Sequence, residues 1–378
     1  MSKTMNTPPT IRWQLLSTVS ALALLTSAYA AGEAEAAGND ADRPLIWIEL
    51  GGQMENISGQ GEVFAPAFLA ANPNSSVLGP VTPLQAQRPP KFSFGEEGRI
   101  SFQPEGSDWI FSAAIRYGRS GNFRHVDHQT DGTHHASYNG HPTGNLFTQA
   151  DFADTQAHHK ETHAILDFAV GKDIGLGFFG REGSSNLSAG IRFAQFTANA
   201  AFDIRARPDL HVKYFTGYNR HFPFLYFHTY HATGHASRSF RGVGPSLSWN
   251  GSAPFVGNSH DGEITLDWGA NAAILFGKQK AHVRHQETGH YKSKFDFNNI
   301  YVSAYSPRLG GHIAVRSVTV PNVGGFAGVS WRVEDFKVSL GYRADFFFGA
   351  MDTGIDARKS ETLGFKGPFA SVSVGLGD

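Results

Sequence analysis

The 378-residue chain has no cysteine, and its 32 Lys and Arg residues almost balance its 33 Asp and Glu residues. The absence of cysteine excludes disulfides, thiolate catalysis and cysteine-ligated metal sites. The balanced charge gives no reason to expect nucleic acid or another polyanion as a partner. After the N-terminal segment the chain also lacks apolar runs of about 18 residues, which excludes a bundle of membrane-spanning helices.

The first thirty residues have the features of a secretory signal. Lys3 and Arg12 supply positive charge, residues 13–25 are mostly apolar, and residues 28–30 read Ala-Tyr-Ala, a small-x-small cleavage site. The alternative is an N-terminal membrane anchor, but the apolar core is too short to span a bilayer. We therefore predict a cleaved signal peptide, followed by a short polar leader that is disordered in the periplasm.

Residues 263–277 alternate strictly between apolar and other side chains. Successive side chains of a strand point to opposite faces, so this segment has one apolar face and one face that begins with polar residues. Such a face is longer than the average strand of a soluble sheet. It fits a strand of about 9–11 residues tilted across a bilayer, apolar toward lipid and polar toward a lumen. The apolar positions are Ile264, Leu266, Trp268, Ala270, Ala272, Ile274 and Phe276.

Nine further segments have the same period of two, and the connections between them alternate between long and short. Outer-membrane barrels have this asymmetry, with short periplasmic turns and long extracellular loops. A soluble β-sandwich would instead need turns every 8–12 residues and would rarely tolerate repeated long loops. The segments are 46–51, 99–103, 109–117, 164–170, 187–193, 243–249, 327–333, 337–348 and 370–376, and the long connections are 55–93, 119–161, 198–238, 278–312 and 349–366.

The predicted fold is all-β: a transmembrane antiparallel β-barrel of about ten strands, within a range of roughly 8–12. Both termini are expected in the periplasm. Trimeric porins usually have more strands, so a monomer is favoured. The predicted domains are a signal peptide at 1–30, a leader at 31–43 and the outer-membrane barrel at 44–378.

The polar faces of these strands would line the interior of the barrel, and they carry five arginines and five carboxylates. The charges would either pair and close a narrow barrel, or line a wet path for small polar solutes. Gly and Ser on the same faces leave room for water and favour the path. The predicted pore-lining residues are Glu49, Arg99, Arg116, Asp167, Arg192, Asp267, Arg332, Arg343 and Asp345, accompanied by Glu97, Gln103 and Asn271.

Histidine is unusually frequent, with 18 residues in the chain. His158, His159 and His163, with Asp151 and Asp154 nearby, are candidate ligands for zinc or copper. No His-Glu-x-x-His spacing supports the site, and solvated loop composition is the simpler explanation. The nucleophile-elbow motif Gly-x-Ser-x-Gly is also absent. We therefore expect no enzyme and no cofactor.

Six runs in order along the chain have a familiar sequence: residues 163–177, 240–247, 270–277, 320–331, 341–346 and 364–376. Together they resemble the Legionella-type major outer membrane protein family, described as pore-forming. The resemblance covers most of the chain after residue 43 and is weakest over 55–93 and 119–160. It implies a porin-like outer-membrane protein and supplies no catalytic residue. One departure is the tail Val374-Gly-Leu-Gly-Asp378, because many outer-membrane barrels end on an aromatic residue that the assembly machinery reads.

These observations predict a porin-like channel for small polar solutes or ions in the outer membrane. Its expected partners are outer-membrane lipid and lipopolysaccharide, the barrel-assembly machinery and the solutes themselves. The alternative is a plugged structural or adhesive barrel whose histidine-rich loops bind metal or a surface partner.

Overall fold

The computed structural model describes residues 45–59, 92–120, 123–134, 137–138, 141–142, 149–174, 184–207, 210–217, 220–258, 261–294, 300–304 and 308–376. Strands are the regular secondary structure of these segments. A helix long and apolar enough to cross a membrane does not occur among them. The predicted signal and leader, residues 1–43, lie outside the described residues.

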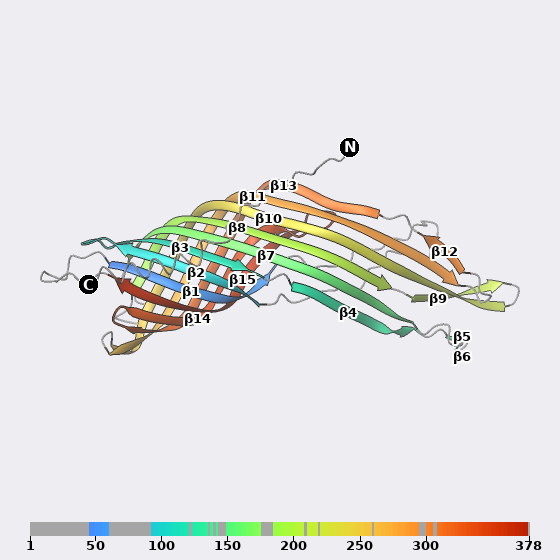
Figure 1. The fold of residues 1–378 in the computed structure, drawn as a ribbon, viewed down its shortest axis with the longest axis horizontal. Coiled ribbons are helices and arrows are strands. Elements are labelled where there is room, and N and C mark those ends of the chain that lie inside the picture. The colour runs from blue at the N-terminus through green and yellow to red at the C-terminus, as the bar shows by residue number, and fades with distance from the viewer. Residues whose placement is uncertain are drawn as a thin grey trace, which may run out of the picture. The chain divides into compact units, whose positions relative to one another are not determined.

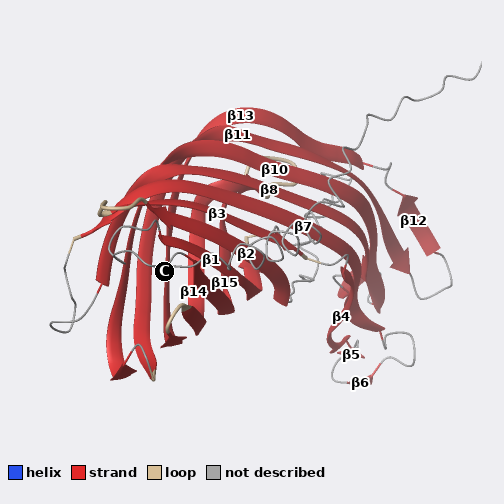
Figure 2. Ribbon diagram, turned by 60° about the vertical axis from the view of Figure 1, so that its left-hand side comes forward, coloured by secondary structure: helices blue, strands red, loops and turns tan. Residues whose placement is uncertain are grey.

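Ten antiparallel strands form a closed ring, as predicted (Figure 2). The last strand pairs with the first, Ile46 opposite Leu376, and the ring continues without a break through the other eight strands. Each predicted segment lies within one of these strands. In ring order they are β1 (Leu45–Ser58), β2 (Phe92–Gln103), β3 (Trp109–Arg119), β7 (Gln149–Asp173), β8 (Ser184–Arg207), β10 (Arg220–Asn258), β11 (Gly262–Lys294), β13 (Arg308–Val333), β14 (Phe336–Asp352) and β15 (Ser360–Leu376).

Five shorter strands lie outside the ring. The strand β4 (Phe123–His134) pairs with β7, β9 (Leu210–Gly217) with β10, and β12 (Ile300–Ala304) with β11. Among the described strands, β5 (Ser137–Tyr138) and β6 (His141–Pro142) pair with each other.

The two ends of the ring differ in their connections. The strands β13 and β14 are joined by Glu334-Asp335 alone, and Glu334 adopts a left-handed φ of 50° to make this tight turn. Residues 104–108 make the similarly short β2–β3 turn. The start of β1 and the end of β15 lie at this end of the ring, because Leu45 pairs with Gln103, the last residue of β2 before its short turn.

The apolar rows of the ring strands point outward. Side chains such as Phe168, Ile191, Leu247 and Phe276 are 50–60% exposed, while the alternate side chains of the same strands point inward. A soluble barrel or sandwich would bury these rows. The predicted outward orientation of the apolar rows is therefore confirmed for the ring.

The predicted long loops are in part wrong. Much of residues 149–161, 198–207, 220–238 and 278–294 is strand, and β10 alone has 39 residues. These extensions keep continuous cross-strand pairing, for example His235 opposite Arg284. The sequence pattern failed here because polar side chains occupy the outer face and small or apolar ones the inner face, the reverse of a lipid-facing strand.

Past the ring, the extensions form an open sheet (Figure 1). The pairing of β13 with β14 begins only at Asn322, so residues 308–321 of β13 pair with β11 alone among the described strands. On the other side, β3 leaves β7 at Thr162, and β4 pairs with the outer part of β7.

Candidate functional site

The interior of the ring is the candidate site, because nearly all the predicted functional residues meet there. Nearest the short turns it is a polar cavity of about 200 Å³ whose wall includes Glu49, Arg99 and Lys337. The carboxylate of Glu49 accepts a hydrogen bond from the Ser371 hydroxyl, 2.7 Å away. At the turn itself, the Arg332 guanidinium lies over the Trp47 ring, 5.5 Å from its centroid.

Asp267 is the centre of a polar cluster beside this cavity. Its carboxylate forms an ion pair with the Lys337 ammonium at 2.6 Å. It also accepts hydrogen bonds from the hydroxyls of Ser252 at 2.6 Å, Thr265 at 3.1 Å and Ser330. A carboxylate with this many donors is fully satisfied in its buried position.

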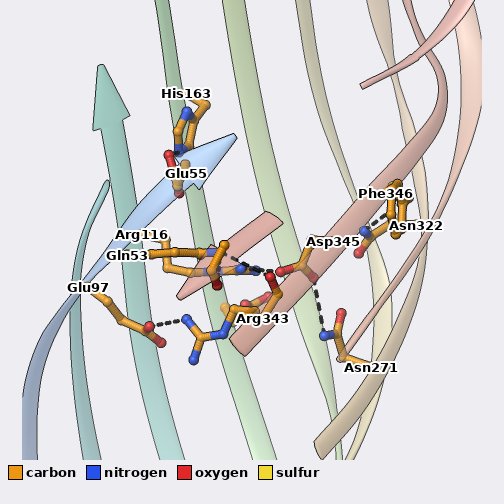
Figure 3. A network of polar contacts seen from close by, with 12 residues as sticks. Gln53, Glu55, Glu97, Arg116, His163, Asn271, Asn322, Arg343, Asp345 and Phe346 are labelled. Carbon is orange, nitrogen blue, oxygen red and sulfur yellow. Dashed lines mark hydrogen bonds and ion pairs between the residues drawn. The ribbon is translucent and has the colours of Figure 1, made fainter. Parts of the chain in front are cut away.

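Two ion pairs cross the middle of the ring (Figure 3). Arg116 of β3 binds Asp345 of β14 at 2.5 Å, although three ring strands separate β3 from β14 along the shorter way round. Arg343 pairs with Glu97, and its guanidinium lies 5.0 Å from the centroid of the Phe369 ring.

A third ion pair joins the neighbouring strands β7 and β8, and its arginine also reaches side chains of β11 and β13. Arg192 of β8 binds both carboxylate oxygens of Asp167, at 2.6 and 3.0 Å. Its Nη1 also donates to the side-chain oxygens of Asn271, at 2.7 Å, and of Asn322 on β13. The Asn271 amide in turn donates to Asp345 at 3.3 Å, so the pairs form one network.

All nine predicted lining residues belong to the interior face, as their strand positions required. Eight of them are held in the contacts above. The ninth, Arg99, lies opposite Glu49 in the pairing of β1 and β2, and it lines both the cavity described above and a second one, of about 80 Å³, beside Arg116 and Arg343. Of the two outcomes left open by the sequence, pairing across the lumen is the one that these contacts favour.

An aromatic layer lies beyond the ion pairs, on the side away from the short turns. Phe196 of β8 is 4.7 Å from Phe347 of β14 and 5.6 Å from Phe365 of β15, between ring centroids. Four ring strands separate β8 from β15 either way round, so these rings meet across the full width of the barrel. With Phe240 they are at most 2% exposed.

Sequence reasoning missed this layer. It assigned the whole inner face to polar residues, whereas the inner face of β8 changes from Arg192 to Ala194 and Phe196. The usable signal was the period of two, which continues unbroken through this change.

The three candidate metal ligands do not converge. His158 is exposed on the outer face, whereas His159 belongs to the inner face and His163 is buried there. The His163 ring lies 3.2 Å from the carboxylate of Glu55 and 3.4 Å from that of Glu161. Among the described residues, no group of three or more ligand-type side chains could hold a metal ion.

The segment 353–359, between β14 and β15, contacts inward side chains of β10 and β11. Arg238 donates from Nη2 to the carbonyl oxygens of Thr353 and Gly354, at 3.1 and 3.3 Å. His285 Nε2 lies 2.6 Å from an Asp356 carboxylate oxygen, and Ile355 is buried with Ala236 and Val283. We refer to residues 353–359 as the closing segment.

Asp352 fixes the base of the closing segment. Its carboxylate lies 2.9 Å from His312 Nε2 and accepts hydrogen bonds from the backbone amides of Gly354 and Lys359. Burial acts to raise the pKa of Asp352, but these donors outweigh it and the pKa is lowered below its ordinary value. The ionised form therefore stabilises the closed arrangement.

Comparison with known proteins adds little to this geometry. No protein-family model matches the chain, and no curated protein matches it. Among solved structures, it aligns with the transport unit of the autotransporter AIDA-I from Escherichia coli over 94% of this chain and 97% of that one. The sequences are 8% identical and the TM-score is 0.15, a value too low to support an argument.

Proposed function

We propose that this chain is an outer-membrane β-barrel with a closed interior, which anchors its long strand extensions at the cell surface. The observation that carries the proposal is the contact of Phe196 with Phe347 and Phe365 across the ring. A solute would have to displace this layer and the ion pairs beneath it. This corresponds to the plugged structural or adhesive barrel rather than to a freely open pore.

The membrane location is supported by the outer surface of the ring. Its exposed apolar rows would be costly in water and are stable against lipid. They end at one level on adjacent strands: Phe193, Val243 and Phe276 lie side by side in the pairing, and Gln195, Arg241 and Lys278 follow directly. Export by a cleaved signal remains part of the proposal.

A porin-like channel is the second candidate. The polar cavities on the short-turn side, both lined by Arg99, could hold water and small polar solutes. The resemblance to pore-forming barrels points the same way. In this case the aromatic layer and the closing segment would form a gate that must open for transport.

Planar bilayer recording separates the two candidates. We expect the purified wild-type protein to give no sustained conductance steps. The double variant Phe196→Ala, Phe365→Ala removes two rings from the layer and should produce steps, while Phe168→Ala, on the outer face, should behave as wild type. Sustained steps from the wild type would contradict the closed barrel and favour the porin.

A further inference from the structure

The outer face of the strand extensions carries a basic surface, which none of the functions above uses. It begins directly above the apolar rows and spans four successive levels of the pairing on β7, β10 and β11, with neutral outward side chains on the intervening β8 and the adjoining β13. Its cationic and histidine side chains are all exposed. The basic face consists of Lys160, Arg241, Lys278, Lys280 and Arg284, with His158, His235 and His282.

One pair of like charges lies directly opposite on this face, because Arg241 pairs with Lys278 in the register of β10 and β11. Directly opposed like charges destabilise a sheet. On these four levels, the outward positions of the five strands include no Asp or Glu. The repulsion is therefore not offset by carboxylates on the same face, and an anionic ligand would relieve it.

The position of the basic face relative to the apolar rows defines the ligand further. Lys278 is two residues beyond the exposed Phe276 on the same face, and Arg241 is two residues from Val243. Two residues of a strand span about 6.8 Å. Phosphates attached to the head of a lipid whose acyl chains cover Phe276 would lie at the height of these cations.

The surface is also hollowed where such a head group would lie. A depression of about 440 Å³ lies among Lys160, Asn199, Ser237 and Arg284, which offer charged and neutral hydrogen-bond donors. A second hollow at the edge of the apolar rows is lined by Phe276 and Lys278 together with Thr319 of β13. A ligand that is apolar at one end and phosphorylated and hydroxylated at the other matches both.

We propose that the basic face binds the phosphate groups of the phosphorylated glycolipid of the outer leaflet, lipopolysaccharide. Arg241 and Lys278 contact the phosphate nearest the acyl chains, and Lys280, Lys160 and Arg284 contact phosphates and sugars further out. Arginine and lysine are the side chains suited to phosphate recognition. The inference rests on the proposed outer-membrane location.

The test uses the full-length protein refolded in detergent and titrated with diphosphorylated lipid A, with bound lipid counted by native mass spectrometry. The variant Arg241→Gln, Lys278→Gln, Lys280→Gln should weaken binding at least about tenfold, because it removes three charge-assisted contacts to phosphate. The control variant Arg119→Gln, Lys366→Gln removes two exposed cations from the other side of the barrel and should change binding less than about twofold.

Two further ligands decide the source of the phosphate. Fully dephosphorylated lipid A should bind the wild type and the triple variant equally weakly. Inorganic pyrophosphate, at the same concentration as diphosphorylated lipid A, should not displace that lipid from the wild type. Equal binding with and without phosphates, equal loss in both variants, or full competition by pyrophosphate would each overturn the proposal. Insertion of the wild type into lipid vesicles is measured separately, and failure to insert would overturn the proposed function and this inference with it.

Discussion

The two halves of β11 differ in which face is apolar, although they belong to one continuous strand. Up to Phe276 the outward side chains are apolar, as at Leu266 and Ile274, and an inward one is the buried Asp267. Beyond Lys278 the outward side chains are polar, among them Lys280 and Arg284, whereas Ala281 and Val283 are buried inside. The period of two never changes. Only the assignment of faces changes, as expected when the outer solvent changes from lipid to water.

The change occurs at the same level on β8 and β10. Phe193 on β8, Val243 on β10 and Phe276 on β11 form the last apolar row, and the next row outward is polar on all three strands. A register slip of one residue would put a polar row against lipid. The common level therefore marks one boundary between an apolar and a polar outer surface. Substitutions below it, in the ring, and above it, in the extension, should have different effects.

The largest difference in stability loss between the ring and the extension is expected when a buried charge loses its partner. Asp345→Ala would leave Arg116 buried without its carboxylate, at a cost of about 3–5 kcal/mol of unfolding free energy. In the extension, Asp203 is half-exposed beside His231, and Asp203→Ala should cost less than about 1 kcal/mol. Urea unfolding of both variants in lipid vesicles measures the two values. Similar losses would show that the ring interior is wet.

A smaller difference in stability loss is expected when arginine is placed on the outer face of β11, below and above the boundary. Ala270 lies midway along the apolar row of β11, and Ala270→Arg should cost about 2–4 kcal/mol, as for arginine facing the middle of a bilayer. The matched change His282→Arg, on the same face above the boundary, should stay within about 0.5 kcal/mol. Urea unfolding in lipid vesicles measures both variants. If His282→Arg lowered the unfolding free energy as much as Ala270→Arg does, lipid would cover position 282, and the boundary at Phe276 would be wrong.

The smallest effect concerns pH and the closing segment. The pKa of Asp352 is lowered in the folded state, so its stabilising contribution is present above its unfolded pKa of about 3.9 and is lost as pH falls through the lower, folded pKa. Pepsin cleavage within 353–359 should therefore increase as the solution is acidified below about pH 3.9, before the ring strands are cut. Asp352→Asn should already be cleaved at higher pH; cleavage of the wild type that does not depend on pH would contradict this role.

The sequence predicted the ring well because each ring strand carries its outward apolar residues at every second position. It failed for the extensions and the aromatic layer because alternation alone does not say which face points outward. Phe196 and Val283 therefore could not be assigned to the interior. The closing segment was also out of reach, since Arg238 and Thr353 meet only through the long-range register of the barrel. The paired arginines were assigned to the right face, but their partners depend on the same register.

The most direct test of the boundary uses the absence of cysteine in the chain. Single cysteines at positions 266, 274, 280 and 284 of β11 all lie on the outer face, and each can be reacted with a membrane-impermeant maleimide in protein refolded into vesicles. The account predicts rapid labelling of Lys280→Cys and Arg284→Cys, and protection of Leu266→Cys and Ile274→Cys until the lipid is dissolved. Equal labelling at all four positions would contradict a lipid-facing ring beneath a water-facing extension.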